Sequence, residues 1–217
     1  MTEHPSTRIY GGVSAERRRA ERLRRLLDAG LEVIGTKGYA GTTVKGVCRR
    51  ARLTERYFYE AFADREALLR AVYDDVVARV IGSVAAALIE APADPAARAR
   101  AGLRAFFATL TGDRRLARVQ LIEVVGVSAE LERHRRSTMH TFARIISRNA
   151  QELIPEAADN TAEVRLTSLA LVGATNELVT DWLLGHLKES PEELADHCAA
   201  LFLATIGALD AQADATD

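Results

Sequence analysis

The sequence predicts an all-α fold. Along most of the 217 residues, apolar side chains recur at spacings of three and four, which is the pattern of amphipathic helices. No segment alternates strictly between apolar and polar residues as a half-buried strand does, and only five prolines interrupt the chain. We therefore expect a small three-helix domain at the N-terminus and a larger helical domain after it.

The first helix is predicted from Ala15 to Ile34. Residues 1–14 have little to bury and contain Pro5, so we expect a flexible N-terminal arm there. Gly35 and Gly38 are expected to end the helix, because glycine readily adopts the left-handed conformation that closes helices. The apolar face of this helix comprises Leu23, Leu26, Leu27, Leu31 and Ile34.

Residues 42–62 predict two short helices separated by a tight break. Thr42 or Thr43 can cap the first helix, since a hydroxyl accepts a hydrogen bond from an unpaired amide of the first turn. The break falls at Arg52, and Thr54 caps the second helix, ERYFYEA. The apolar face of the first helix comprises Val44, Val47 and Cys48.

The second short helix, residues 54–61, leaves an unusual set of side chains outside. Phe58 and Phe62, four residues apart, form its buried stripe. The outward set is Glu55, Arg56, Tyr57, Tyr59 and Glu60. Two aromatic rings and an arginine on so short a helix indicate a docking surface, and the partner that we expect is double-stranded DNA.

The motifs support this interpretation. TTV at 42–44, LTxxxxYxxF at 53–62 and DREALL at 64–69 resemble the helix-turn-helix of the TetR family of bacterial transcriptional regulators, over about residues 17–77. Two positions depart from the family pattern. Arg52 stands where the family has glycine, and Gly46 lies inside the first short helix, where glycine costs about 1 kcal/mol relative to alanine.

The resemblance and the outward side chains together give the candidate DNA-binding residues. These are Thr42, Thr43, Lys45, Thr54, Glu55, Arg56, Tyr57, Tyr59 and Arg65. We expect Arg56 and Tyr57 to meet base edges, with Arg56 directed to guanine. The resemblance implies that Arg65, in the first turn of the next helix, contacts the DNA backbone. The arginines between Arg17 and Arg25 are expected to reach backbone or minor groove.

The charge is unevenly distributed. Residues 1–60 hold 13 basic and 7 acidic residues, whereas the remaining residues hold 16 and 23. A basic front end with an acidic body fits a protein that touches phosphate at one end only, although helices also carry charge for solubility. The position beside the helix-turn-helix favours the nucleic-acid interpretation.

The chain divides into domains accordingly. We expect a DNA-binding domain at 15–63, with its helix-turn-helix at 43–62, then a helical domain for effector binding and dimerisation at 64–210, and a tail at 211–217. The second domain has breaks at 91–95 and 155–160. Its expected helices are 64–89, 95–111, 113–126, 128–153, 161–188 and 191–210.

Polar residues inside apolar stretches suggest an effector pocket in the second domain. Thr109, Glu123 and Asn176 lie in such surroundings, where an unpaired polar group costs free energy. They either orient a ligand or bond across helices, and for Glu123 the two interpretations are even. The candidate pocket residues are Phe106, Thr109, Leu110, Glu123, Phe142 and Asn176.

The last two predicted helices are apolar on two sides. Such a helix must be covered both by its own core and by a second surface, which favours a homodimer over a monomeric bundle. The candidate interface residues are Leu171, Leu178, Trp182, Leu194, Cys198 and Leu201.

The sequence shows no sign of an enzyme. It contains no phosphate-binding glycine loop and no nucleophile elbow, and Glu130 with His134 lacks a third metal ligand, so we expect no metal and no cofactor. Two distant cysteines fit a reduced cytoplasm. No apolar run is long enough for a membrane span.

These observations predict a transcriptional regulator. We expect a repressor that binds a palindromic operator as a homodimer and is released by a small, largely apolar effector. One alternative is a regulator that needs no effector and responds to a protein partner. The other is an enzyme or carrier that uses the pocket of the C-terminal domain.

Overall fold

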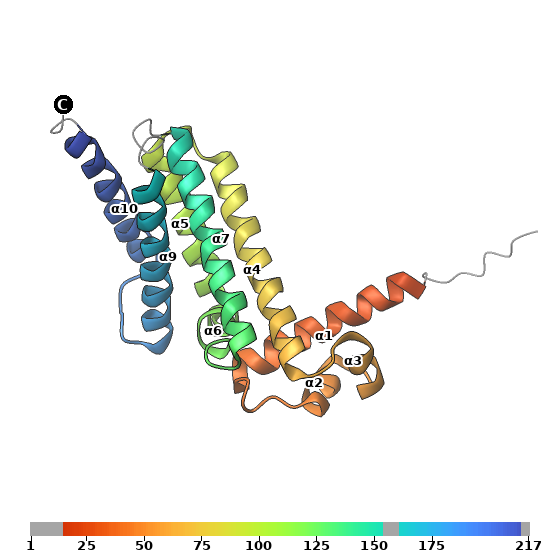
Figure 1. Ribbon diagram of the computed structural model, residues 1–217. Helices are drawn as coiled ribbons and strands as arrows, with labels where there is room; N and C mark the ends of the chain where they lie inside the picture. Colours follow the sequence, from red (N-terminus) through yellow and green to blue (C-terminus); the bar gives the residue numbers. More distant parts are fainter. Residues whose placement is uncertain (1–14, 154–160, 214–217) are drawn as a thin grey trace, which may run out of the picture.

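The computed structural model describes residues 15–153 and 161–213, with side chains described through residue 205. Every regular element in these residues is a helix, so the predicted all-α class is confirmed (Figure 1). The predicted arm at 1–14, the predicted break at 155–160 and residues 214–217 of the predicted tail lie outside the described residues.

The N-terminal domain contains α1 (Ala15–Lys37), α2 (Val44–Ala51) and α3 (Glu55–Ala61). Helix α1 continues through Gly35 and stops at Gly38, which has φ +80°. The predicted stop at Gly35 is therefore wrong. A Cβ on Gly35 would lie 2.5 Å from Cβ of Arg115, so this glycine lets α6 (Arg114–Arg118) pack closely against α1.

The turn between α2 and α3 is left-handed despite its lack of glycine. Arg52 has φ 54° and ψ 46°, a conformation that costs a non-glycine residue about 1–3 kcal/mol. Arg25 of α1 offsets this strain: its Nη2 donates to the carbonyls of Ala51 and Arg52 at 2.6 and 2.9 Å. A cation at these C-terminal carbonyls of α2 is also favoured by the helix dipole. A contact from another helix thus holds the turn in this conformation.

Helix α4 (Arg65–Glu90) leads from the N-terminal domain into the body (Figure 1). Asp64 caps it by accepting a hydrogen bond from the amide of Ala67 at 2.8 Å. Its first half buries a continuous stripe: Leu68, Leu69, Val72, Tyr73, Val76 and Val80. One helix therefore belongs to both domains.

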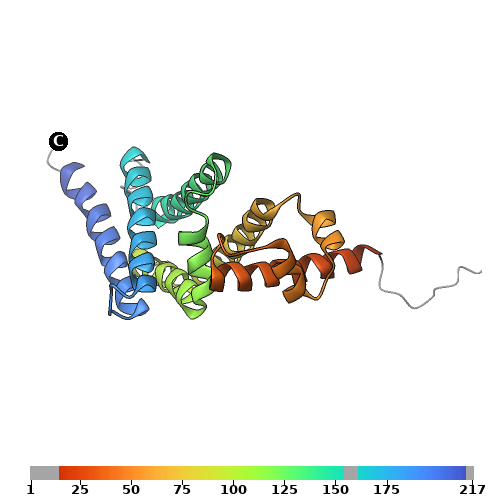
Figure 2. The same cartoon turned by 90° about the horizontal axis from the view of Figure 1, so that it is seen from below.

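Four further long helices build the body: α5 (Pro95–Gly112), α7 (Ala129–Leu153), α9 (Thr161–Leu184) and α10 (Pro191–Ala213). Helix α5 packs on α4, α7 packs on α9, and α10 packs on both α5 and α9. Both views place α9 and α10 on the side away from the N-terminal domain (Figures 1 and 2). Gly185, at φ +82°, follows α9, which ends earlier than predicted, and α10 extends into the predicted tail.

The segment predicted as one helix at 113–126 is broken. Helix α6 passes into a π-helix, η1 (Val119–Glu123), and the backbone then turns at Gly126, which has φ +73°. π-Helices are rare, occur mostly as single turns next to α-helices and are frequent at functional sites. An apolar run with helical spacing cannot distinguish this wider turn from an ordinary α-helix.

The π-helix places Glu123 against the N-terminal domain. Its Oε2 accepts a hydrogen bond from the amide of Tyr39 at 2.7 Å, and its Oε1 accepts one from Nε of Arg118 at 2.7 Å. The side chain of Glu123 is only 11% exposed. The prediction that Glu123 lines an effector pocket is therefore wrong. Its carboxylate is instead engaged by the loop between α1 and α2 and by Arg118.

Glu123→Gln should lower the free energy of unfolding by about 1–3 kcal/mol, because the single amide oxygen cannot serve both the Tyr39 amide and Arg118. Glu130→Gln removes an exposed ion pair with Arg70 and should cost less than about 1 kcal/mol. Urea unfolding of both variants measures the difference, and equal costs would contradict a structural role for Glu123.

Candidate nucleic-acid interface and body cavity

Helix α3 is almost entirely exposed. Within it only Phe58 is buried, with Phe62 packed against it just beyond the helix. The side chain of Arg56 is 83% exposed and its Nε lies 3.0 Å from Oε1 of Glu60. Thr54 occupies the N-cap position without a hydrogen bond from its side chain, so its hydroxyl can meet a partner. Thr54, Glu55 and Arg56 all lie on this exposed surface.

The two tyrosines of α3 have different environments. Tyr59 is 57% exposed and stands edge-on to the ring of Phe58. Tyr57 is half-buried, because the guanidinium of Arg22 from α1 lies over its ring at 4.6 Å. Arg22 and Tyr57 are 35 positions apart in the chain, so no local pattern in the sequence pairs them.

The start of α2 distinguishes the two threonines. Thr43 is exposed and caps the helix, with its Oγ1 accepting from the amide of Gly46 at 3.0 Å. Thr42 is 1% exposed and donates its hydroxyl hydrogen to the carbonyl of Gly38 at 2.8 Å. The prediction that Thr42 contacts DNA is therefore wrong, because this side chain is buried. Thr43 and Lys45 lie on the outer surface.

Arg65 has structural partners within the domain. Its Nη1 donates to the carbonyl of Thr42 at 2.5 Å, and its guanidinium lies 5.2 Å from the ring centre of Tyr39. These contacts explain a cation in the first turn of α4 without a nearby phosphate. Arg65 positions the loop that leads into α2.

Several arginines of α1 also hold the fold together. Arg24 pairs with Asp28 at 2.6 Å and with Asp75 of α4 at 2.5 Å, and the hydrogen bond that Arg24 donates to Asp75 raises the pKa of Arg24. Asp75 in turn pairs with Arg79 at 2.7 Å. The expectation that the arginines up to Arg25 reach DNA is therefore wrong for Arg24 and Arg25, which link α1 to α4 and to α2.

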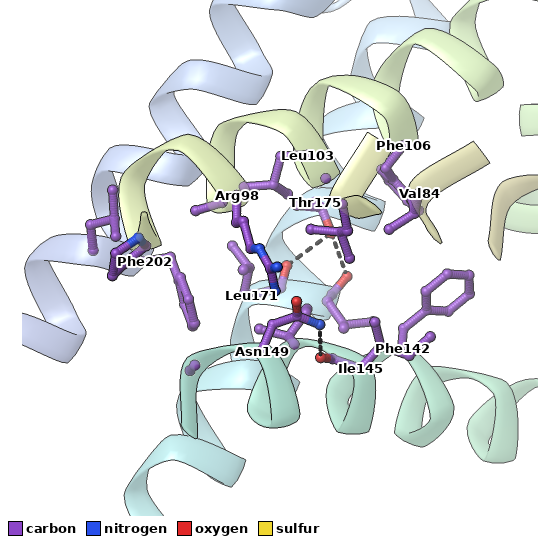
Figure 3. A pocket seen from close by; sticks show the side chains of 18 of the residues that line it. Val84, Arg98, Leu103, Phe106, Phe142, Ile145, Asn149, Leu171, Thr175 and Phe202 are labelled. Carbon is purple, nitrogen blue, oxygen red and sulfur yellow. Dashed lines mark hydrogen bonds between the residues drawn. The ribbon is translucent and has the colours of Figure 1, made fainter. Parts of the chain in front are cut away.

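The body holds an apolar cavity of about 100 Å³ between α4, α5, α7, α9 and α10. Figure 3 shows it from close by. Its polar lining residues are Arg98, Asn149 and Thr175. Its other lining residues are Val84, Leu88, Pro95, Ala99, Gly102, Leu103, Phe106, Phe142, Ile145, Ile146, Ala150, Leu153, Leu171, Val172, Phe202 and Leu203.

Two of the predicted pocket residues line this cavity. Phe106 and Phe142 meet edge to face, with ring centres 6.0 Å apart. Thr109 and Leu110 lie about one turn beyond the cavity on α5; the hydroxyl of Thr109 donates to its own helix, and Leu110 is fully buried. Asn176 follows Thr175 and is turned about 100° around α9. These three, like Glu123, do not line the cavity.

Half of the predicted dimer residues belong to the subunit's own core. Leu171, Leu194 and Cys198 are 8%, 6% and 1% exposed, so they cannot form an outer seam without rearrangement. Burial raises the pKa of the Cys198 thiol to about 11. Leu178 and Trp182 are half-buried, and the ring of Trp182 lies under Arg114.

Other side chains remain available for a dimer. Leu201 of α10 is 52% exposed, and Leu166 and Leu184 of α9, which the sequence analysis missed, are 55% and 56% exposed. An apolar pattern on two sides of a helix does not tell which side faces the subunit's own core.

Glu130 and His134 have separate partners in Arg70 and Asp74. The described parts of the chain contain no group of three or more potential metal ligands. Within the same residues, no helix combines the length and apolar character that crossing a membrane requires.

Comparisons with known proteins agree with this architecture. The sequence model of the family described as "Bacterial regulatory proteins, tetR family" matches residues 26–72. A fatty acid metabolism regulator protein of Bacillus subtilis (strain 168) is 22% identical over 182 residues, which cover 83% of this chain and 93% of that protein.

Solved structures share the fold. The fatty acid degradation regulator FadR from Bacillus halodurans matches with a TM-score of 0.74 at 20% identity, covering 84% of this chain and 94% of that one. FadR from Bacillus subtilis, solved in complex with stearoyl-CoA, matches with a TM-score of 0.72 at 21% identity, covering 84% and 98%. The family match spans the whole helix-turn-helix, so the N-terminal part of this chain carries a DNA-binding domain like that of the TetR family, and the chain as a whole is similar to bacterial transcriptional regulators.

Proposed function

We propose that this regulator is a cytoplasmic repressor that binds a palindromic operator as a homodimer and leaves it when an effector with an apolar chain enters the body cavity. The observation that carries the proposal is the course of α4. Its first turns pack in the N-terminal domain, and Val84 and Leu88 near its end line the cavity. A ligand that moves the end of α4 can therefore act on the DNA-binding domain.

The exposed surface of α3 is the element that enters the major groove in this proposal. Arg56 is the candidate for a guanine edge, and Thr54, Glu55 and Tyr57 lie beside it on the same short helix. Thr43, Lys45 and Tyr59 are candidates for phosphate contacts. Arg65, held by the carbonyl of Thr42, retains donors that can face a phosphate, but its first role is to hold the loop.

Dimerisation is assigned to the outer faces of α9 and α10. Leu166 and Leu201 are the large apolar side chains there, and small exposed alanines accompany them. These are Ala170 and Ala174 on α9 and Ala200 and Ala204 on α10. Small residues allow two copies to approach closely, and a two-fold axis would present two α3 helices to half-sites one turn apart, about 34–36 Å.

The size of the cavity supports an effector that changes the conformation. At about 100 Å³ it is smaller than the roughly 300 Å³ or more of a site for a drug-sized ligand. A bound chain must therefore widen the space between the helices. The similar FadR of Bacillus subtilis was solved with stearoyl-CoA, and we propose an effector with an acyl-type chain for this protein too.

Selection of bound sequences from a random pool of double-stranded DNA should enrich a palindrome. Binding to it should weaken with salt by a slope near −0.9 per phosphate contact in a log–log plot, because basic side chains release counterions. Enrichment of no sequence, or an affinity that does not change with salt, would contradict a DNA-binding repressor.

Arg56→Ala should relax the preference at one base pair of each half-site by about 1–3 kcal/mol, since Arg56 is the candidate reader of guanine. The matched control is Arg136→Ala, because Arg136 is an exposed arginine of the body that pairs with Glu132 as Arg56 pairs with Glu60. Repeating the selection with both variants tests the assignment, and an unchanged operator with Arg56→Ala would remove Arg56 from the base edges.

Leu201→Glu should convert dimers into monomers that keep their helical circular dichroism. The change buries an unpaired carboxylate in the dimer but leaves it exposed in a single subunit, where Leu201 is already 52% exposed. Ile89→Glu, at an 83% exposed site on α4, should remain dimeric. Sedimentation at micromolar concentration measures both, and a dimeric Leu201→Glu or a monomeric wild type would contradict this interface.

A further inference from the structure

Among the described residues that line the body cavity, Arg98 is the only charged one. Its Nε is buried and has no hydrogen-bond partner among the described residues. Its Nη1 lies 4.0 Å from Oε2 of Glu152, a side chain that is 67% exposed, so this ion pair is long and faces solvent. The structure therefore contains an incompletely paired guanidinium on an otherwise apolar wall.

The surroundings of Arg98 favour an anion. Arg98 is the fourth residue of α5, one turn after the N-cap Asp94. The helix dipole there disfavours a cation and stabilises negative charge. A buried donor on a cation without an acceptor also costs free energy, which a bound anion would recover.

The other polar groups of the cavity donate hydrogen bonds to carbonyls of their own helices. The hydroxyl of Thr175 donates to the carbonyls of Leu171 and Val172 at 2.9 and 3.1 Å. Nδ2 of Asn149 donates to the carbonyl of Ile145 at 2.9 Å. In Figure 3 the side chain of Arg98 extends from α5 toward Asn149 on α7. The guanidinium is thus the strongest donor left for a ligand.

The cavity extends along α5, with Arg98 at one end and two aromatic rings at the other. Phe106 lies eight residues after Arg98 on α5, which is about 12 Å along the helix, and Phe142 packs against it. Between these two ends the wall of α5 is apolar, formed by Ala99, Gly102 and Leu103. This length corresponds to an extended aliphatic chain on the order of ten carbon atoms.

We propose that Arg98 binds the anionic head group of a single-chain amphiphile whose aliphatic chain runs toward Phe106 and Phe142. This inference depends on one part of the proposed function, namely that the cavity is the effector site. The head group is a free carboxylate or a phosphate of an acyl-CoA, because a guanidinium pairs with both through two parallel hydrogen bonds. Its ion pair replaces the long contact with Glu152.

The test compares three ligands with equal chains, decanoate, 1-decanol and decanoyl-CoA, by isothermal titration of the full-length protein. Wild type should bind at least one of the two anionic ligands about tenfold or more tightly than decanol. Arg98→Gln should abolish that preference while changing decanol affinity less than about twofold. Arg98→Lys should keep part of the preference, because it retains the charge but not the planar fork.

Arg104→Gln is the matched control. Arg104 lies on α5, pairs with Asp196 of α10 at 2.7 Å and does not line the cavity, so the preference for the anionic ligand should survive. Thermal unfolding of each variant checks the fold. A preference for decanoate assigns the head group to a carboxylate, whereas a preference for decanoyl-CoA assigns it to a phosphate.

Equal wild-type affinities for all three ligands, or a preference that persists in Arg98→Gln, would overturn the role of Arg98. Binding of none of the three would overturn this inference together with the apolar effector of the proposed function. Binding that depends on Arg98 but leaves operator affinity unchanged would support this inference and overturn only the proposed release from DNA. Operator affinity is therefore measured separately with the same ligands.

Discussion

The continuous course of α4 from the N-terminal domain into the body is the constraint on which the rest of the structure depends. Leu68 and Leu69 of its first turns are fully buried, and Val84 and Leu88 near its other end line the cavity. Because the helix is continuous over 26 residues, a displacement at one end is transmitted along it more readily than through a loop. In the proposed function, this single element couples the cavity to the N-terminal domain.

A second connection joins the N-terminal domain to the body through α6 and the π-helix. Gly35 admits α6 against α1, and the π-helix that follows α6 places the carboxylate of Glu123 on the amide of Tyr39. Glu123 thus fixes the loop that leads to Thr42, and Arg65 of α4 holds the carbonyl of that residue. The loop before α2 is held from both the body and α4, so a relative movement of the two supports must shift α2 and α3.

The sequence predicts those features that depend on neighbours in the chain. The break at Arg52, the helix that begins next to residue 64 and the exposed face of α3 follow from local patterns, and the structure has all three. The sequence does not distinguish Thr42 from Thr43, since either hydroxyl can cap α2. Only the folded loop buries Thr42 and leaves Thr43 exposed. Gly35 fits a helix stop equally well, and its actual partner, Arg115, is 80 residues away.

The candidate sites show the same limit. A polar residue in an apolar run predicts burial, but Glu123 serves a domain contact and Asn176 lies outside the cavity. Arg98 is the opposite case. It lies among other arginines of an amphipathic helix, and the sequence alone therefore predicts that it faces solvent. Its relation to the cavity arises only when α7, α9 and α10 close around α5. Likewise, Cys198 and Leu201 differ in exposure although both continue one apolar pattern.

The small volume of the cavity has a thermodynamic consequence for the proposed repressor. An effector shifts a conformational equilibrium only by the difference between its affinities for the two states. A cavity of about 100 Å³ binds a ten-carbon chain poorly as it stands, so the chain favours a wider conformer strongly. Each factor of ten in that preference corresponds to about 1.4 kcal/mol, and operator DNA must weaken effector binding by the same factor. Tight packing around the cavity therefore increases the ligand's preference for the wider conformer over the one in this structure. It also lowers the overall affinity, because the cavity must first widen.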